Sequence, residues 1–137
     1  MVDLVITAAN VVKGSNATLA NGTAGATITA GQALYLEAAT TTYKLADCDS
    51  ATAEVRSPAG IALHASLSGQ PITLQTAGDI TIGATLAAGV AYYLSPNAGG
   101  IAPVADILSG DYPVLLGLAK STTVITLKIQ EAGVALA

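Results

Sequence analysis

The chain contains two similar blocks in the same order, and this repetition restricts the folds open to it. Residues 29–36 read TAGQALYL and residues 87–94 read AAGVAYYL, so in both an Ala-Gly pair is followed by x-Ala-x-Tyr-Leu. A Thr-Ile pair precedes each block, at 27–28 and at 81–82. Two copies are too few for a solenoid, which needs roughly three or more repeats. We therefore expect the copies to form two halves of one folded unit.

Further matches follow the blocks in both copies. Each copy has an apolar segment that ends in Ala-Asp, then a Gly-apolar-Ala triplet, then an Ile-Thr-Leu triplet. These matches lie at 46–47 and 105–106, at 60–62 and 117–119, and at 72–74 and 125–127. One domain is the default for a chain of this length. The matches predict a single domain over residues 27–137, with an internal duplication that covers 27–78 and 81–130.

The local patterns are those of β-strands. Short segments rich in β-branched residues and tyrosine alternate with glycine, proline, asparagine and serine, which is typical of strands joined by turns. The predicted strands are 33–36, 61–64, 72–75, 80–82, 91–94, 114–116 and 124–129, with 4–7 as a further candidate. Gly31 and Gly89 each precede a strand, where a turn with positive φ would need glycine. No window sustains a helical period.

These patterns predict an all-β fold, a compact β-sandwich or barrel with two pseudo-repeated halves and an N-terminal arm. The arm is residues 1–26, which lie outside the repeat and include the small, polar segment 14–26. Such a segment is flexible in isolation, and either a partner or a local β-hairpin would order it. We expect the arm to make assembly contacts. The candidate contact residues are Leu4, Val5, Ile6, Val11, Val12 and Leu19.

The chain is poor in charge. A typical soluble domain has about 25% Asp, Glu, Lys and Arg, but here these residues make up 10% of the sequence. A surface with so little charge is poorly protected against self-association. The simplest explanation for the low charge is that other subunits cover much of this surface. The net charge of −4 argues against nucleic acid as a partner, because nucleic-acid binding needs a basic face. A spanning helix needs about 20 consecutive apolar residues and no such run exists, so we expect no membrane partner.

No group of residues points to catalysis. His64 is the only histidine, which leaves no histidine pair for a metal site. Cys48 lies between two aspartates, whose carboxylates would raise the pKa of the thiol rather than lower it. The run DCDS at 47–50 resembles the start of a calcium loop, but Thr52 and Pro58 stand where that loop needs glycine and glutamate. We therefore expect no enzyme activity, no cofactor and no metal site.

The segments that repeat also resemble a known family. Residues 28–36, 58–62, 78–83 and 87–94 are similar to small capsid decoration (cement) proteins of tailed bacteriophages and prophages. In that family Ala-Gly-x-x-Val/Leu-Tyr leads a strand, Gly-Ile/Val-Ala follows, and a strand ends the chain. The resemblance covers roughly residues 25–130. It implies a compact β-fold on the outer capsid surface that bridges neighbouring major capsid proteins, often as a homotrimer, and it brings no catalytic motif.

The resemblance and the scarcity of charge give one expected function. The chain would be a phage virion structural protein, made in the bacterial host cytoplasm, that decorates and stabilises the capsid by binding the outer surface of the major capsid protein lattice. Its partners would be the major capsid protein and other copies of itself. The alternative is a receptor- or carbohydrate-binding module of a phage head or tail fibre, which predicts an exposed tyrosine cluster. Tyr35 and Tyr93 hold matching positions in the two blocks, which favours a packing role for both.

Overall fold

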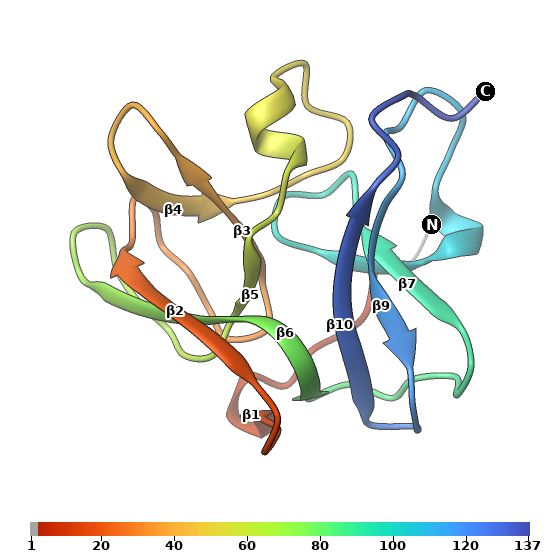
Figure 1. The fold of residues 1–137 in the computed structure, drawn as a ribbon, viewed down its shortest axis with the longest axis horizontal. Coiled ribbons are helices and arrows are strands. Elements are labelled where there is room, and N and C mark those ends of the chain that lie inside the picture. The colour runs from red at the N-terminus through yellow and green to blue at the C-terminus, as the bar shows by residue number, and fades with distance from the viewer. Residues whose placement is uncertain (1–2) are drawn as a thin grey trace.

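The computed structural model describes residues 3–137 and is nearly all β (Figure 1). Within those residues ten strands pair antiparallel in a curled sheet that forms a half-barrel, which confirms the predicted fold class. The strands are β1 (Val11–Lys13), β2 (Thr18–Thr23), β3 (Ala33–Glu37), β4 (Thr42–Leu45), β5 (Gly60–Ala62), β6 (Pro71–Ile82), β7 (Ala91–Leu94), β8 (Ile101–Pro103), β9 (Val114–Ala119) and β10 (Val124–Glu131). Short 3-10 helices span Ala8–Asn10, Ala53–Arg56 and Val104–Asp106. None of the helices in this part of the chain could cross a membrane.

The same strand order occurs twice, so the pseudo-repeated halves are visible in the pairing. The first half has the order β4-β3-β5-β6 and the second has the order β8-β7-β9-β10. The strand β6 belongs to both halves. Its first part pairs with β2 and β5, and its last residues pair with β1 and β10. In Figure 1, β6 crosses the base of the half-barrel, with the first half on the left and the second on the right.

The register of the strands is also the same in both halves. Leu34 lies opposite Gly60 in the first half, and Tyr92 lies opposite Gly117 in the second. A Cβ on either glycine would collide with a backbone carbonyl oxygen of the next strand. Glycine is therefore needed at both positions because two backbones approach closely, and the Gly-apolar-Ala triplets of the sequence mark this approach.

The predicted glycine turns before β3 and β7 are confirmed. Gly31 has a φ of 91° and Gly89 has a φ of 83°, both in the region that side chains avoid. The two turns are tied to the next strand in the same way. The N–H of Gly31 donates to the carbonyl of Ala62 at 2.8 Å, and the N–H of Gly89 donates to the carbonyl of Ala119 at 2.7 Å.

Two matches made from the sequence are wrong in detail. The N–H groups of Ile28 and Leu86 bond to Ser66 and Thr122 in equivalent places, three residues before the turn glycine. The counterpart of Ile28 is therefore Leu86, whereas 81–82 lies inside β6. The Ile-Thr-Leu triplets are also offset by two residues, because the register makes Leu74 the counterpart of Ile125. An offset of two keeps the same alternation of faces, so the sequence pattern could not reveal it.

The strand β6 is continuous, although the sequence predicts two separate strands within it. A bulge at Thr76, between Gln75 and Ala77, interrupts its alternation, and Gly78 just beyond it has a φ of 92°. Gln75 and Ile80 are both fully buried in the concave core, although residues five apart point to opposite sides of a regular strand. The side chain of Gln75 supports the bulge, because its Nε2 donates to the carbonyls of Ala77 at 3.2 Å and Asp79 at 2.7 Å.

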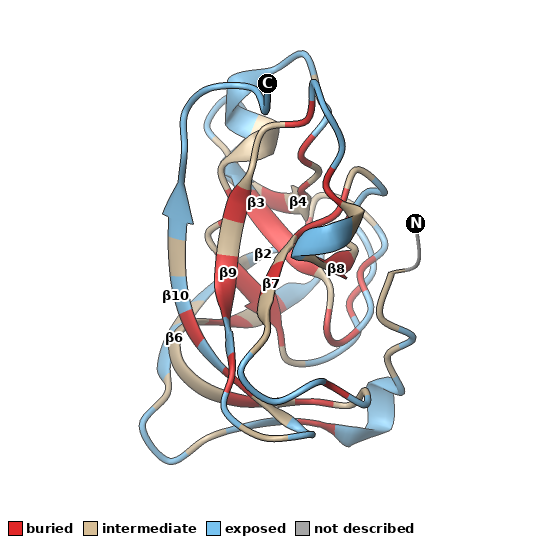
Figure 2. Cartoon of the chain, turned by 90° about the vertical axis from the view of Figure 1, so that its right-hand side faces the viewer, coloured by how far each residue is buried: buried red, intermediate tan, exposed pale blue. Residues whose placement is uncertain are grey.

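The bulge determines which side of each half faces inward. The main core fills the half-barrel and joins residues of the first half, such as Ile61 and Tyr35, to residues of the second, such as Leu94 and Leu116. A second, smaller core lies on the other side of the first half, around Leu34 and Leu74. The first half is therefore covered on both sides, whereas the outer side of the second half is not. Figure 2 shows the resulting alternation of exposed and buried residues along β9 and β10.

Candidate functional site

The N-terminal segment is built into the sheet. The strands β1 and β2 run antiparallel to β6 over most of its length, and the N–H of Leu4 donates to the carbonyl of Ile101 at 2.8 Å. Residues 1 and 2 of the predicted arm lie outside the described residues. Backbone pairing with β6 therefore orders the rest of this segment from within the chain, as pairing in a local β-hairpin would.

The six candidate contact residues divide into two groups. Leu4, Ile6 and Val11 pack against the main core. The other three face outward, with exposed fractions of 85% for Val5, 56% for Val12 and 39% for Leu19. Only this second group is available to a partner. The sequence shows six apolar residues without showing which of them turn inward.

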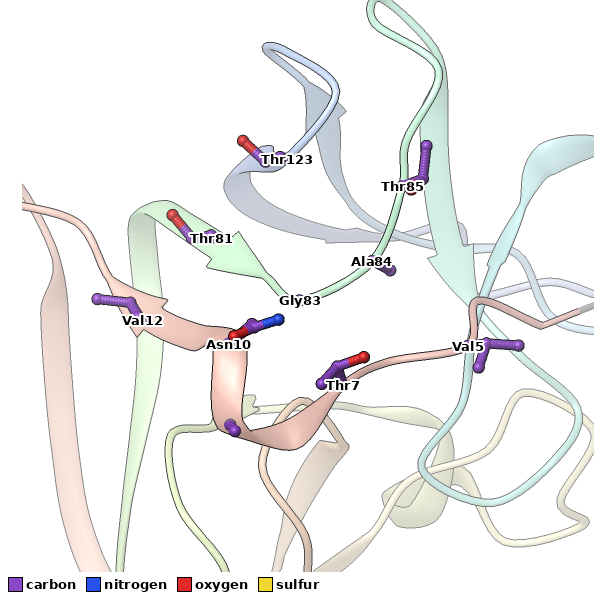
Figure 3. A pocket seen from close by; sticks show the side chains of 10 residues that line it. Val5, Thr7, Asn10, Val12, Thr81, Gly83, Ala84, Thr85 and Thr123 are labelled. Carbon is purple, nitrogen blue, oxygen red and sulfur yellow. The ribbon is translucent and has the colours of Figure 1, made fainter.

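Two of the outward residues lie in a groove, which we call the N-terminal groove (Figure 3). It has a cavity volume of about 610 Å³. Its lining residues are Val5, Thr7, Ala9, Asn10, Val12, Thr81, Gly83, Ala84, Thr85 and Thr123. In Figure 3, Val12 and Val5 lie at opposite ends, with Asn10 and Thr7 between them.

The groove has a definite chemistry. None of its lining side chains is ionisable, and methyl groups alternate with hydroxyls and one amide. The N–H of Thr7 donates to the carbonyl of Gly83 at 2.8 Å, which joins its two walls. Such a surface suits an uncharged segment that offers apolar side chains and backbone hydrogen bonds. Sequence reasoning missed the threonines at 81, 85 and 123, because they come from the end of β6, from the loop after it and from the turn before β10, and no local motif marks them.

A charged pair lies beside the groove. Asp79 accepts from the Nζ of Lys120 at 2.8 Å and from the Oγ1 of Thr126 at 2.8 Å. These two hydrogen bonds, that from Lys120 first, hold the pKa of Asp79 below its usual value. The two charges compensate each other, so the pair itself has little net charge to offer an ionic ligand.

Cys48 is inert in this fold. The thiol is fully buried, and burial, followed by the carboxylates of Asp111, Asp49 and Asp47, raises its pKa to about 12. A thiol with such a pKa is not a nucleophile near neutral pH. Burial also raises the pKa of Asp47, with a further contribution from Asp49. Among the described residues no group of three or more His, Cys, Asp or Glu could hold a metal ion.

His64 extends the pairing of β5 and β6. Its Nε2 accepts from the N–H of Thr73 at 3.0 Å, and its Nδ1 lies 2.9 Å from the carbonyl of Ala65. Both ring nitrogens are engaged by the backbone. These contacts assign the imidazole of His64 a structural role beside the pairing of β5 and β6.

The tyrosines do not form an exposed platform. Tyr35, Tyr43 and Tyr92 are buried, and Tyr93 and Tyr112 are half-buried. The guanidinium of Arg56 lies 3.6 Å from the ring centre of Tyr112 and covers it. A carbohydrate-binding surface of stacked aromatic rings is therefore not favoured here.

Comparisons with protein-family models, with curated proteins and with solved structures find no match for this chain. The function must therefore be argued from the surfaces of the chain itself.

Proposed function

We propose that the chain is a virion structural protein of a tailed bacteriophage, which decorates and stabilises the capsid by binding the outer surface of the major capsid protein lattice. The observation that carries the proposal is the N-terminal groove, an uncharged surface with Val5 and Val12 exposed. The family resemblance of residues 25–130 and the low charge of the chain support it.

The proposed mechanism is adhesive. Apolar surface removed from water contributes about 25 cal/mol per Å², so a contact on the two exposed valines is modest for a single copy. The threonine hydroxyls and the amide of Asn10 would add hydrogen bonds to a capsid segment. Many copies on one lattice, linked through self-association, would add their contributions as avidity, and the shell would resist heat better than without them.

The test uses capsids of the encoding phage that were assembled without this chain. We expect the purified protein to sediment with these capsids and to raise the temperature at which they release DNA. Val12→Asp would place a charge in the groove and should abolish binding. Leu67→Asp is the matched control, since Leu67 is 57% exposed and Val12 is 56% exposed. Leu67 lies in the turn before β6, at the other end of that strand from the groove.

Two results would reject the proposal. One is a wild-type protein that binds no capsid lattice. The other is a Val12→Asp variant that binds as well as Leu67→Asp, since the groove would then be irrelevant. A glycan-array signal that is lost in Tyr93→Ala would favour the carbohydrate-binding alternative instead.

A further inference from the structure

The carboxyl groups of the chain are concentrated at one end of the molecule, which we call the acidic end. It is formed by three segments, residues 47–57, 104–113 and 131–137. These segments contain six of the nine Asp and Glu residues but one of the five cations, whereas the rest of the chain has three and four. The six are Asp47, Asp49, Glu54, Asp106, Asp111 and Glu131. The negative net charge of the chain therefore comes from this end.

Contacts between the segments hold the acidic end together. The Oγ of Ser57 donates to Glu131 at 2.8 Å, which joins the first segment to the third. Arg56 joins the first segment to the second, because its guanidinium lies 3.6 Å from the ring centre of Tyr112. Its Nη1 also donates to the carbonyl of Ser50 at 2.9 Å. The cation of this end is therefore engaged in contacts within the fold.

An apolar patch lies at the same end. The last residues of the chain run beside the loop that leads to β9, since the N–H of Leu136 donates to the carbonyl of Asp111 at 2.7 Å and its carbonyl accepts from the N–H of Gly110 at 2.8 Å. Three side chains of these two segments are exposed, with fractions of 57% for Leu108, 66% for Val134 and 40% for Leu136. We call these three residues the C-terminal patch.

The surroundings of the C-terminal patch indicate the kind of partner that fits it. Exposed apolar residues with a polar rim are typical of interaction sites, and here the rim is acidic. Glu131 is exposed and precedes Val134 in the same segment. Asp49 is exposed and follows Cys48, whose carbonyl accepts from the N–H of Tyr112 at 3.0 Å. Such a rim favours a cationic partner, because complementary charges across an interface attract and like charges repel.

We propose that the C-terminal patch and its acidic rim bind a cationic amphipathic segment of another protein, in which apolar side chains are interspersed with Lys or Arg. The apolar side chains cover the patch, and the cations meet the carboxylates around it. A second copy of this chain offers no such segment, because its five cations are spread singly along the sequence and two of them are in ion pairs. They are Lys13, Lys44, Arg56, Lys120 and Lys128.

This site is separate from the N-terminal groove. In Figure 1 the short helix Ala53–Arg56 and the C-terminus lie at the top, whereas β1, which carries Val12, lies at the bottom. A chain that is bound through the groove therefore keeps its acidic end open to a second protein. The inference goes beyond the proposed function and does not rest on it, so either can fail while the other holds.

The test measures the binding of short synthetic peptides by isothermal titration calorimetry. One peptide alternates leucine with lysine, the second alternates leucine with glutamate, and the third alternates serine with lysine. We expect the leucine–lysine peptide to bind, and to bind more weakly at high salt, because salt screens exposed charges. The other two should bind about tenfold more weakly or less, the change that about 1.4 kcal/mol produces.

Variants locate the binding site. Leu108→Ser combined with Leu136→Ser should weaken binding of the leucine–lysine peptide about tenfold or more. Leu67→Ser is the matched control, because Leu67 and Leu108 are both 57% exposed and Leu67 lies in the turn before β6. Val12→Asp should leave peptide binding unchanged, since it alters only the groove. Circular dichroism checks that each variant is folded, and Val134→Ser replaces the double variant if that variant is not.

Several results would overturn the inference. One is a leucine–lysine peptide that does not bind. Equal binding of the serine–lysine peptide would make the patch irrelevant, and equal binding of the leucine–glutamate peptide would make the charge irrelevant. Binding that survives the patch variants would place the peptide elsewhere. Light scattering tests the other occupant, because self-association that is lost in the patch variants would show that a second copy covers the patch.

Discussion

At the scale of single residues, Gln75 shows how a polar side chain can be essential in an apolar core. It is fully buried, and its Nε2 donates to two carbonyls of the β6 bulge. Its Oε1 is buried without a partner, which costs free energy. The balance favours glutamine only if the two donated bonds are worth more than the unpaired oxygen.

The prediction is that Gln75→Leu lowers the free energy of unfolding by about 1–3 kcal/mol, the usual cost of leaving buried polar groups without partners. Urea denaturation measures the change. Gln130→Leu makes the same substitution at an exposed position and should stay within about 0.5 kcal/mol of the wild type. If Gln75→Leu were more stable than the wild type, the unpaired oxygen would outweigh the support of the bulge.

Predictions for single residues were confirmed where the backbone conformation requires a particular residue type. Gly31 and Gly89 need positive φ, and the repeat makes that need visible twice. Only part of the candidate site could be predicted from the sequence. Val5 and Val12 were found as apolar residues outside the repeat, but their inward neighbours Leu4 and Ile6 have the same character in the sequence. Only the tertiary packing separates the two groups.

At the scale of elements, sequence reasoning found the strands that have a complete hydrophobic pattern and missed the others. The segments Thr18–Thr23 and Ile101–Pro103 contain glycine, asparagine or proline, which are depleted in strands. Both lie at an edge of the sheet, where such residues are tolerated. Conversely, residues 4–7 are rich in β-branched residues like a strand but form none. Thr18–Thr23 forms a strand because it pairs with β6, which is distant in sequence, and Ile101–Pro103 forms one because it pairs with the neighbouring β7.

The bulge in β6 gives a prediction at this scale. Gly78 and Gly69 have similar positive φ values, 92° and 88°, but their surroundings differ. A Cβ on Gly78 would lie 2.5 Å from the carbonyl oxygen of Asn16, whereas a Cβ on Gly69 would meet nothing within 4 Å. Gly69→Ala should cost about 1–2 kcal/mol, the backbone strain alone, and Gly78→Ala should cost more because the clash is added.

Thermal and urea unfolding of both alanine variants test this difference. The two variants share the backbone strain, so the excess for Gly78→Ala isolates the contact between β6 and the 14–17 segment. Equal losses would mean that this segment moves aside freely and does not hold the bulge.

At the scale of the whole molecule, the two halves cannot fold as separate domains. They share β6, and the main core contains residues from both. The N–H of Cys48 also bonds to the carbonyl of Ser95 at 3.1 Å, and its carbonyl accepts from the N–H of Tyr112 at 3.0 Å. The duplication seen in the sequence therefore describes a repeated pattern inside one cooperative unit.

We expect a single unfolding transition, with coincident curves from tyrosine fluorescence and far-ultraviolet circular dichroism. The measurement is made at low protein concentration, so that dissociation of copies does not add a step. Two separate transitions would show that one half remains folded without the other, contrary to the shared strand and core.

The shared strand also limits how the length of this chain can change. The loops between β5 and β6 and between β9 and β10 differ in length without altering the pairing of their strands. A single residue inserted or deleted between Gln75 and Ile80 would instead exchange the two sides of everything beyond it. A shift of one position in this segment would therefore expose the core side chains of the second half to solvent and bury its exposed ones.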